Sequence, residues 1–267
     1  MSPISELFLF PPPPSPFVTA MSVISFTSLA YTGFSELRGK HLHYSKFWNA
    51  NPNERRKEIK LSSRAGMLFL YSPALAAALA SFAIPGDLLS STRSLLLCAA
   101  LSIHFFKRVF EVLFIHQYSG QMMLDSAIVI SLSYFTATVT MIYTQYLTEN
   151  TAEPVLDLKY AGVVLFLIGI IGNFYHHYLL SKLRGKDDKG YKIPRGGLFG
   201  VVICPHYLFE IIGFIGVTFI SQTVYALSFT LGTILYLIGR SYATRKWYLS
   251  KFENFPRNVK ALIPLIF

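Results

Sequence analysis

Long apolar stretches dominate this chain, and shorter polar or basic segments separate them. Seven of the stretches are long enough to cross a bilayer as helices, which takes about 17 to 25 residues. A helix satisfies its backbone hydrogen bonds internally, as hydrocarbon surroundings require. The pattern therefore predicts an all-α polytopic membrane protein. The expected spans are Phe17–Phe34, Arg64–Ile84, Ser94–Ile115, Asp125–Leu147, Leu158–Leu180, Leu198–Ile220 and Val224–Tyr242.

Lysine and arginine gather in three polar segments, which follow the first, fifth and seventh spans. With seven spans these segments all lie on one side of the membrane, whereas six spans would scatter them. Basic residues favour the cytoplasmic side. We therefore expect a lumenal N-terminus and a cytosolic C-terminus.

Composition supports a membrane protein and excludes an ordinary soluble domain, because 52% of the residues are hydrophobic and only 14% are charged. The net charge of +10 suits an anionic ligand. No GxGxxG follows a strand and no phosphate-binding P-loop motif is present, so a soluble nucleotide-binding fold is not supported. We expect a tail at residues 1–16, N-terminal membrane helices at 17–115 and a C-terminal domain at 116–267.

Polar side chains interrupt the spans at their cytosolic ends. Those of the third span stand at positions i, i+3, i+4 and i+7 and therefore share one face of a helix. Those of the sixth span lie roughly 12–18 Å inside it at 1.5 Å per residue. Polar groups within a membrane are expensive and usually face a cavity or a partner, so this convergence indicates a polar cavity open to the cytosol. The residues are His104, Lys107, Arg108, Glu111, Asn173, His177, His206, Tyr207 and Glu210.

Other interpretations of these residues remain open. The stripe in the third span could be internally paired and serve only helix packing. The basic loop 182–195 could do no more than contact lipid phosphates. His176, His177 and His206 suggest a metal, but the histidine repeats of membrane di-iron enzymes are missing, so no metal is expected.

Three motifs carry a resemblance to a known family: YKIPRGGLF from Tyr191, CPHYLFE from Cys204, and KALIPLIF at the end. They resemble the C-terminal domain of the steroid 5α-reductase family, which includes the trans-2-enoyl-CoA reductases. The resemblance is close from Phe105 to Phe267. It implies a membrane-bound reductase of a C=C bond conjugated to a carbonyl in a lipid, with NADPH as hydride donor. It also implies the endoplasmic reticulum, with membrane lipids and a lipid substrate as partners and no nucleic acid.

The resemblance also implies which residues form the site. Tyr207 matches the tyrosine of the enoyl-CoA reductase motif and is expected to donate the proton or polarise the carbonyl. Tyr71 is expected as a second donor, where steroid enzymes have glutamate. The implied cofactor contacts are Arg108, Asn173, Arg184, Tyr191, Gly196, Gly197, His206, Glu210, Arg240 and Tyr248.

The chain departs from both branches of the family. Leu70 and Tyr71 replace the Gln-Glu pair of the steroid enzymes, and Phe105 replaces a tyrosine. The third span reads HFFKRVFEVLFIH, as in enoyl-CoA reductases, whereas the YKIPRGGLF loop is of the steroid kind. The substrate class therefore stays open between a 3-oxo-Δ4-steroid and a trans-2-enoyl-CoA.

Two further functions are alternatives. One is a methyltransferase like the isoprenylcysteine carboxyl methyltransferases, although this chain has no Arg-His before Pro205. The other is a sterol- or lipid-binding membrane protein without catalysis, which the changes at Leu70, Tyr71 and Phe105 motivate.

Overall fold

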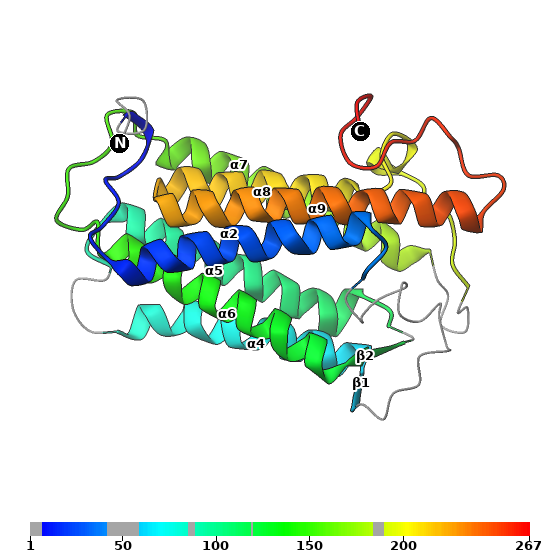
Figure 1. The fold of residues 1–267 in the computed structure, drawn as a ribbon, viewed down its shortest axis with the longest axis horizontal. Helices are drawn as coiled ribbons and strands as arrows, with labels where there is room; N and C mark the ends of the chain where they lie inside the picture. Colours follow the sequence, from blue (N-terminus) through cyan, green and yellow to red (C-terminus); the bar gives the residue numbers. More distant parts are fainter. Residues whose placement is uncertain (1–6, 42–58, 85–88, 119, 184–189) are drawn as a thin grey trace.

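Seven helices of 17 or more residues form one elongated bundle within the part of the chain that this computed structural model describes, residues 7–41, 59–84, 89–118, 120–183 and 190–267 (Figure 1). The helical fold class expected from the sequence is confirmed. The helices are α2 (Pro16–Leu37), α4 (Ser63–Ala80), α5 (Thr92–Phe110), α6 (Leu124–Tyr146), α7 (Lys159–Lys182), α8 (Pro205–Ser221) and α9 (Val224–Lys251).

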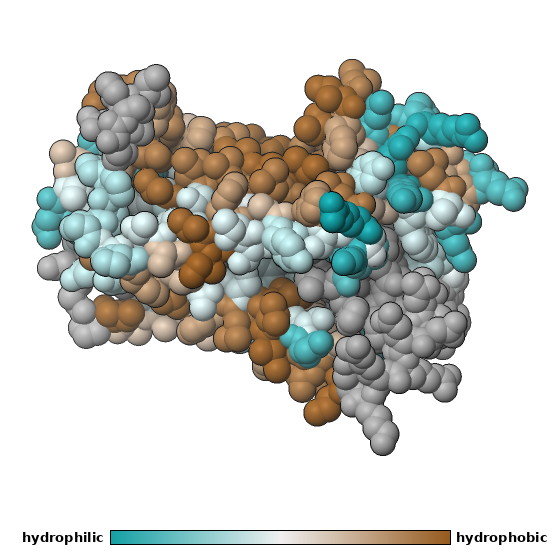
Figure 2. All heavy atoms as spheres, viewed as in Figure 1, coloured by the Kyte–Doolittle hydropathy of each residue, from teal (hydrophilic) through white to brown (hydrophobic). Residues whose placement is uncertain are grey.

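Five of these helices are long and apolar enough to cross a membrane: α2, α4 with its 3-10 extension η1 (Ser81–Ala83), α6, α7 and α9. Helix α5 carries Arg93, Lys107 and Arg108, and the apolar α8 has only 17 residues. On the face of the bundle that Figure 2 shows, hydrophobic residues form broad patches along the helices, and hydrophilic ones gather at the end where α9 finishes. By the length and composition of its helices, the chain is an integral membrane protein.

Hydroxyl side chains cap the N-termini of four of the helices. The side chains of Ser15, Ser62, Ser91 and Thr223 each accept a hydrogen bond from a backbone N–H in the first turn that follows. These N–H groups have no partner within the helix, so the cap stabilises the helix start.

Glycines bring α7 and α8 into close contact. A Cβ atom on Gly169 would lie 2.3 Å from the backbone nitrogen of Gly213, and one on Gly216 would lie 2.4 Å from that of Phe166. No larger residue fits at either position unless the helices separate. Small residues let membrane helices pack backbone to backbone in this way.

A short sheet departs from the all-helical expectation. Strand β1 (Lys60–Ser62) pairs antiparallel with β2 (Gln121–Met123), with Lys60 opposite Met123. The sheet joins the segments that lead into α4 and α6, so these two helices start side by side.

The sixth helix begins later than the expected Leu198. Residues Gly197–Gly200 form a 3-10 turn, η4, and Val202 then forms a parallel bridge with Lys260 of the C-terminal tail. The helix starts at Pro205, because a proline ring excludes the helical conformation from the residue before it.

This later start corrects the depth expected for the polar residues of α8. His206, Tyr207 and Glu210 lie in its first two turns, and Glu210 is only about 8 Å from the helix start at 1.5 Å per residue. The expected distance of 12–18 Å from the start of the helix is therefore wrong. The last helix also continues nine residues beyond the expected Tyr242, to Lys251.

Candidate active site

Glu111 lies at the centre of the candidate site, and its side chain is completely buried. Its carboxylate accepts hydrogen bonds from Lys107 Nζ and Arg108 Nη1, each at 2.9 Å. His177 Nδ1 of α7 lies 3.0 Å from the same carboxylate. A buried charge is costly unless charged or polar partners surround it. The cluster therefore holds the end of α5 against α7.

A π-helical turn shapes the end of α5. Residues Glu111–Ile115 form this turn, η3, and the backbone N–H of His116 donates to the carbonyl oxygen of Glu111 at 2.7 Å. The turn places the His116 ring 4.9 Å from the His177 ring, between centroids. Such widened turns often occur at functional sites.

Asn173 of α7 extends the cluster to α8. Its side-chain oxygen accepts a hydrogen bond from Lys107 Nζ, and its Nδ2 donates to the backbone oxygen of His206 at 2.7 Å. Nδ2 also lies 3.5 Å from the Glu210 carboxylate. Asn173 is buried, so its amide fixes the first turn of α8 relative to α5 and α7.

Tyr71 of α4 joins the cluster through Arg108. Arg108 Nη2 donates to the Tyr71 hydroxyl oxygen at 2.5 Å, and the guanidinium carbon lies 4.7 Å from the centre of the Tyr71 ring. The ring packs against Phe105 and Tyr134 in a buried apolar cluster. Arg108 thus contacts both the Tyr71 hydroxyl and the Glu111 carboxylate.

Tyr207 lies at the other end of the same series of contacts. The His206 ring is 5.3 Å from His177 and 4.2 Å from Tyr207, between centroids. Tyr207 also packs against the cluster around Tyr248 and the C-terminal tail. The two expected catalytic tyrosines are therefore linked through Arg108, Glu111, His177 and His206.

A cavity of about 210 Å³ opens beside this cluster. Burial and the charge of Arg108 lower the pKa of His116 in its wall to about 4, so this imidazole is neutral near pH 7. Two expected cofactor residues, Tyr191 and Tyr248, meet in the wall, and the Tyr248 hydroxyl donates to the backbone oxygen of Lys192 at 3.4 Å. The lining residues are His116, Gln117, Tyr118, Leu180, Ser181, Leu183, Tyr191, Lys192 and Tyr248.

Of these lining residues, only Tyr191 and Tyr248 are among the expected cofactor contacts. The other seven are His116, Gln117, Tyr118, Leu180, Ser181, Leu183 and Lys192. His116 ends the HFFKRVFEVLFIH motif, so the motif itself was the signal. The π-helical turn that points the chain back toward α7 has no comparable sign in the sequence.

The glycine loop contacts His176. Gly196 and Gly197 have positive φ of 85° and 51°, which glycine adopts without strain. His176 Nε2 accepts from the backbone N–H of Leu198 at 3.1 Å, and a Cβ on Gly197 would lie 2.7 Å from that nitrogen. His176 Nδ1 donates to the backbone oxygen of Gly172 at 2.7 Å. The sequence indicates His176 only as a possible metal ligand, whereas in the structure it positions the loop.

Arg240 holds two helices together. It is buried in α9, and its Nη1 donates to the Glu36 carboxylate of α2 at 2.7 Å. Arg184, the other arginine expected at the cofactor, lies outside the described residues.

Among the residues that the structure describes, one group of three side chains has the spacing of metal ligands. Nitrogen and oxygen atoms of Glu111, His116 and His177 all lie within 4.8 Å of one another. However, Lys107 and Arg108 already bind the Glu111 carboxylate, and their positive charges disfavour a divalent cation there.

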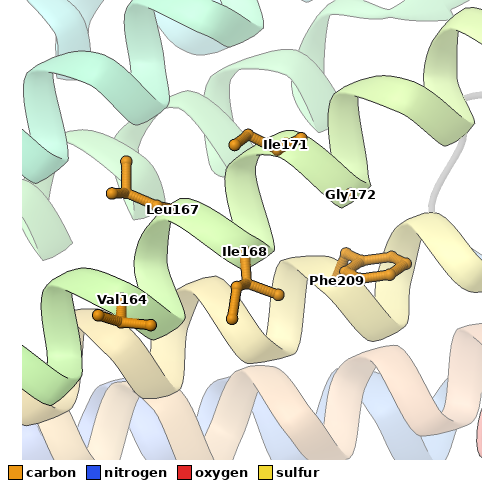
Figure 3. Close-up of a pocket in the computed structure, with 6 residues that line it drawn as sticks. All are labelled: Val164, Leu167, Ile168, Ile171, Gly172 and Phe209. Atoms are coloured by element: carbon orange, nitrogen blue, oxygen red, sulfur yellow. The ribbon is translucent and has the colours of Figure 1, made fainter.

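A larger hollow of about 440 Å³ lies on the outer side of α7 and α8 (Figure 3). Val164, Leu167, Ile168, Ile171, Gly172 and Phe209 line it. None of these residues carries a polar side chain, so the hollow belongs to the apolar surface of the bundle and not to the candidate active site.

Comparison with known proteins gives a consistent result. The family model described as 3-oxo-5-alpha-steroid 4-dehydrogenase matches residues 121–267. The chain is 30% identical over 233 residues to 3-oxo-5-alpha-steroid 4-dehydrogenase 1 of Macaca fascicularis, which covers 86% of this chain and 87% of that protein. It is 37% identical to 3-oxo-5-alpha-steroid 4-dehydrogenase 2 of Sus scrofa over 47% of this chain and 50% of the relative.

A plant protein is also similar. Steroid 5-alpha-reductase DET2 of Gossypium hirsutum is 41% identical over 108 residues, which are 40% of this chain and 42% of the relative. The expected family is confirmed, and so is the expectation of an oxidoreductase that acts on a CH–CH group. The chain belongs to the 3-oxo-5-alpha-steroid 4-dehydrogenase family, the steroid 5α-reductases.

Proposed function

We propose that this protein is an NADPH-dependent reductase of the C=C bond of a 3-oxo-Δ4-steroid or a closely similar lipid enone. The observation that carries the proposal is the buried series of contacts from Tyr71 to Tyr207, which runs beside the cavity lined by Tyr191 and Tyr248. The names of the relatives support a steroid enone as substrate.

The residues around the cavity fit part of a dinucleotide. Tyr191 and Tyr248 offer aromatic faces, Lys192 offers a positive charge, and Gly196 and Gly197 leave the backbone uncovered. We assign the cofactor to these residues, together with Arg108, Asn173, Arg184, His206, Glu210 and Arg240. NADPH supplies a hydride to the β-carbon of the enone when it is bound.

The chain supplies the hydrogen bonds and the proton. Tyr71 donates to the carbonyl oxygen, and Arg108, which donates to the Tyr71 hydroxyl, stabilises negative charge that develops there. Tyr207 delivers the proton that completes the reduction. Tyr71, supported by Arg108, thus takes the place of the glutamate that stands at its position in the steroid enzymes and of the tyrosine that Phe105 replaces.

Turnover of single-hydroxyl variants tests the assignment. General acid catalysis contributes typically 10²–10⁴-fold, so Tyr207→Phe is expected to lose turnover by about that factor while NADPH binding persists. Tyr71→Phe is expected to lose less, because Arg108 remains to stabilise the negative charge that develops on the carbonyl oxygen. Wild-type turnover in Tyr207→Phe, with none in Tyr71→Phe, would reverse the two roles.

The substrate class is tested by substrate-dependent NADPH oxidation of the purified protein. A 3-oxo-Δ4-steroid is expected to be reduced, and a trans-2-enoyl-CoA is the competing substrate that HFFKRVFEVLFIH suggests. Oxidation with the enoyl-CoA alone would contradict the steroid assignment. Binding of NADPH without turnover of either substrate would instead support the alternative of a lipid-binding protein without catalysis.

We further propose seven membrane crossings in the endoplasmic reticulum, with the candidate site on the cytosolic side. Helices α5 and α8 complete the count, because Lys107 and Arg108 of α5 contact Asn173 and Tyr71 of other helices, and Glu210 of α8 lies near Asn173 of α7. Glycosylation acceptors at the two ends test this orientation: only the N-terminal one is expected to be modified, and modification of both would exclude seven crossings.

A further inference from the structure

The last residues of the chain form a closed turn. The backbone N–H groups of Leu262 and Ile263 donate to the carbonyl oxygen of Phe267 at 2.8 and 2.7 Å, and the Phe267 N–H donates to the carbonyl oxygen of Ile263 at 3.0 Å. Leu262 is buried against the tail and α9. The chain end is therefore a defined element with one side fixed to the protein, which we call the C-terminal hook (residues 262–267).

The free side of the hook is apolar. Leu265 is 85% exposed and Ile266 is 77% exposed, and no other large hydrophobic side chain in the described part of the chain is more exposed than Leu265. Leu265 also has a positive φ of 65°, an unfavourable conformation for leucine. The fold therefore holds a strained turn that presents two large apolar side chains outward.

The position of the hook indicates what covers these side chains. The Phe267 ring stacks on Tyr242 of α9 at 6.5 Å between centroids and an angle of 15°. Tyr242 is itself exposed, on the same side of α9 as Leu231 and Leu235. It lies about 27 Å from Val224 at 1.5 Å per residue, close to the roughly 30 Å thickness of the hydrocarbon core.

The hook thus continues the apolar surface of a membrane-spanning helix at the level where that helix leaves the membrane. In Figure 1 the C-terminal segment stands out above α9 at the top of the view, and Figure 2 shows it as hydrophobic, with hydrophilic residues beside it toward the end where α9 finishes. Basic residues precede the hook at Lys251, Arg257 and Lys260. Apolar side chains beside lysine and arginine suit the boundary between acyl chains and anionic headgroups.

We propose that the C-terminal hook inserts Leu265 and Ile266 into the headgroup–acyl boundary of the same membrane that the helices span. The partner is the lipid bilayer itself, with anionic headgroups around the basic residues. This interaction surface is separate from the proposed catalytic function.

The hook also bears on the candidate site through the tail. The backbone N–H groups of Ile203 and Cys204 donate to the carbonyl oxygens of Lys260 and Ala261, at 2.9 and 3.2 Å. These bonds fix the segment immediately before Pro205, where α8 begins. Insertion of the hook therefore also holds the tail at Lys260 and Ala261 at the membrane surface, and this part of the tail fixes the start of α8.

The test places a fluorescent thiol label at Leu265→Cys in the full-length protein, in vesicles of phosphatidylcholine and phosphatidylserine. Asn258→Cys is the matched control, because Asn258 is exposed on the same tail but lies in a polar turn. Cys98 and Cys204 are buried, so the labelled wild-type protein gives the background. Ile266→Cys is a second reporter that keeps the test valid if Leu265→Cys fails to fold.

The label at position 265 or 266 is expected to be quenched by nitroxide-bearing lipids and protected from aqueous iodide. The label at position 258 is expected to show the opposite pattern. Iodide quenching at positions 265 and 266 as strong as at 258 would overturn the proposal, because the hook would then face water. Protection from both quenchers would also overturn it, because protein, such as a second copy of the chain, would then cover the hook.

Discussion

Glu111→Gln tests whether one buried carboxylate organises the candidate site. Lys107, Arg108 and His177 all contact this carboxylate, whose side chain has no exposed surface. The amide has nearly the same shape but no charge, so it leaves two cations without their counter-ion. Removing one partner of a buried ion pair costs about 3–5 kcal/mol. The lower end applies here, because the remaining amide oxygen still accepts one hydrogen bond.

A cost of about 3 kcal/mol is readily measured as a thermal shift. For a chain of this size each kcal/mol lowers Tm by roughly 2–4 °C, so Glu111→Gln should melt roughly 6–12 °C below the wild-type protein. Turnover should fall as well, because Arg108 loses the contact that orients it toward Tyr71. The assay is thermal unfolding of the purified protein in detergent, followed by NADPH oxidation with a steroid enone.

Glu210→Gln is the matched control, because it makes the same chemical change in a half-buried carboxylate whose contact with Asn173 is long, at 3.5 Å. Its Tm should stay within a few degrees of the wild-type value, since weak contacts of this kind contribute about 1 kcal/mol or less. Equal melting temperatures for the Glu111→Gln and Glu210→Gln variants would refute the central role of Glu111.

Two further predictions concern the loop and the cavity wall. Gly197→Ala should destabilise the protein by at least about 1 kcal/mol, because Gly197 has positive φ and a Cβ there would meet His176. Gly200→Ala is its control, since a Cβ at Gly200 meets no atom within 4 Å, and equal unfolding temperatures would contradict the steric argument. Burial, and then the charge of Arg108, lower the pKa of His116 from about 6.5 in the unfolded chain to about 4 in the folded protein, so the unfolded form takes up a proton first as the pH falls. Acidification from pH 7 to pH 5 should therefore cost roughly 2 kcal/mol at this residue, and His116→Asn should remove that part of the pH dependence; an unchanged pH profile would show that His116 does not contribute.

The sequence predicted the helices well where hydropathy alone decides their bounds. The observed α6, Leu124–Tyr146, differs by one residue at each end from the expected Asp125–Leu147. The sixth helix was missed by seven residues at its start, because the run from Leu198 to Cys204 is as apolar as the helix that follows. Pro205 indicates the correct start, because proline disfavours the helical conformation of the residue before it, but a hydropathy pattern does not detect this effect.

The polar residues predicted to converge do so, except His104, whose ring packs 5.1 Å from that of Phe214, but their partners could not be read from the sequence. Spacing placed Lys107, Arg108 and Glu111 on one face of a helix. It did not indicate that Asn173 and His177 of α7 would close around the same carboxylate. Such contacts depend on how far α5 and α7 slide along each other, and tertiary packing sets that register.

Arg240 is a second residue whose partner could not be predicted from the sequence. Its charge near the expected cytosolic end predicts a cofactor contact, which the proposed function retains, but nothing in the sequence indicates that its guanidinium also donates to Glu36, far away in sequence on α2. Helices α2 and α9 approach closely at Gly33 and Gly239, where a Cβ on Gly239 would lie 2.1 Å from the Gly33 backbone oxygen. This close contact brings the charges of Arg240 and Glu36 together, and the sequence around either residue does not indicate the other.

The contact between Arg108 and Tyr71 changes how the departures from the family pattern are interpreted. From the sequence alone, the changes at Leu70, Tyr71 and Phe105 suggest a site that has lost its carbonyl donors. In the fold Arg108 donates to the Tyr71 hydroxyl at 2.5 Å while it also contacts Glu111. A hydroxyl that accepts from a guanidinium is well suited to donate its own proton to a developing oxyanion. The replacements are therefore better explained by a different donor at the carbonyl than by the loss of catalysis.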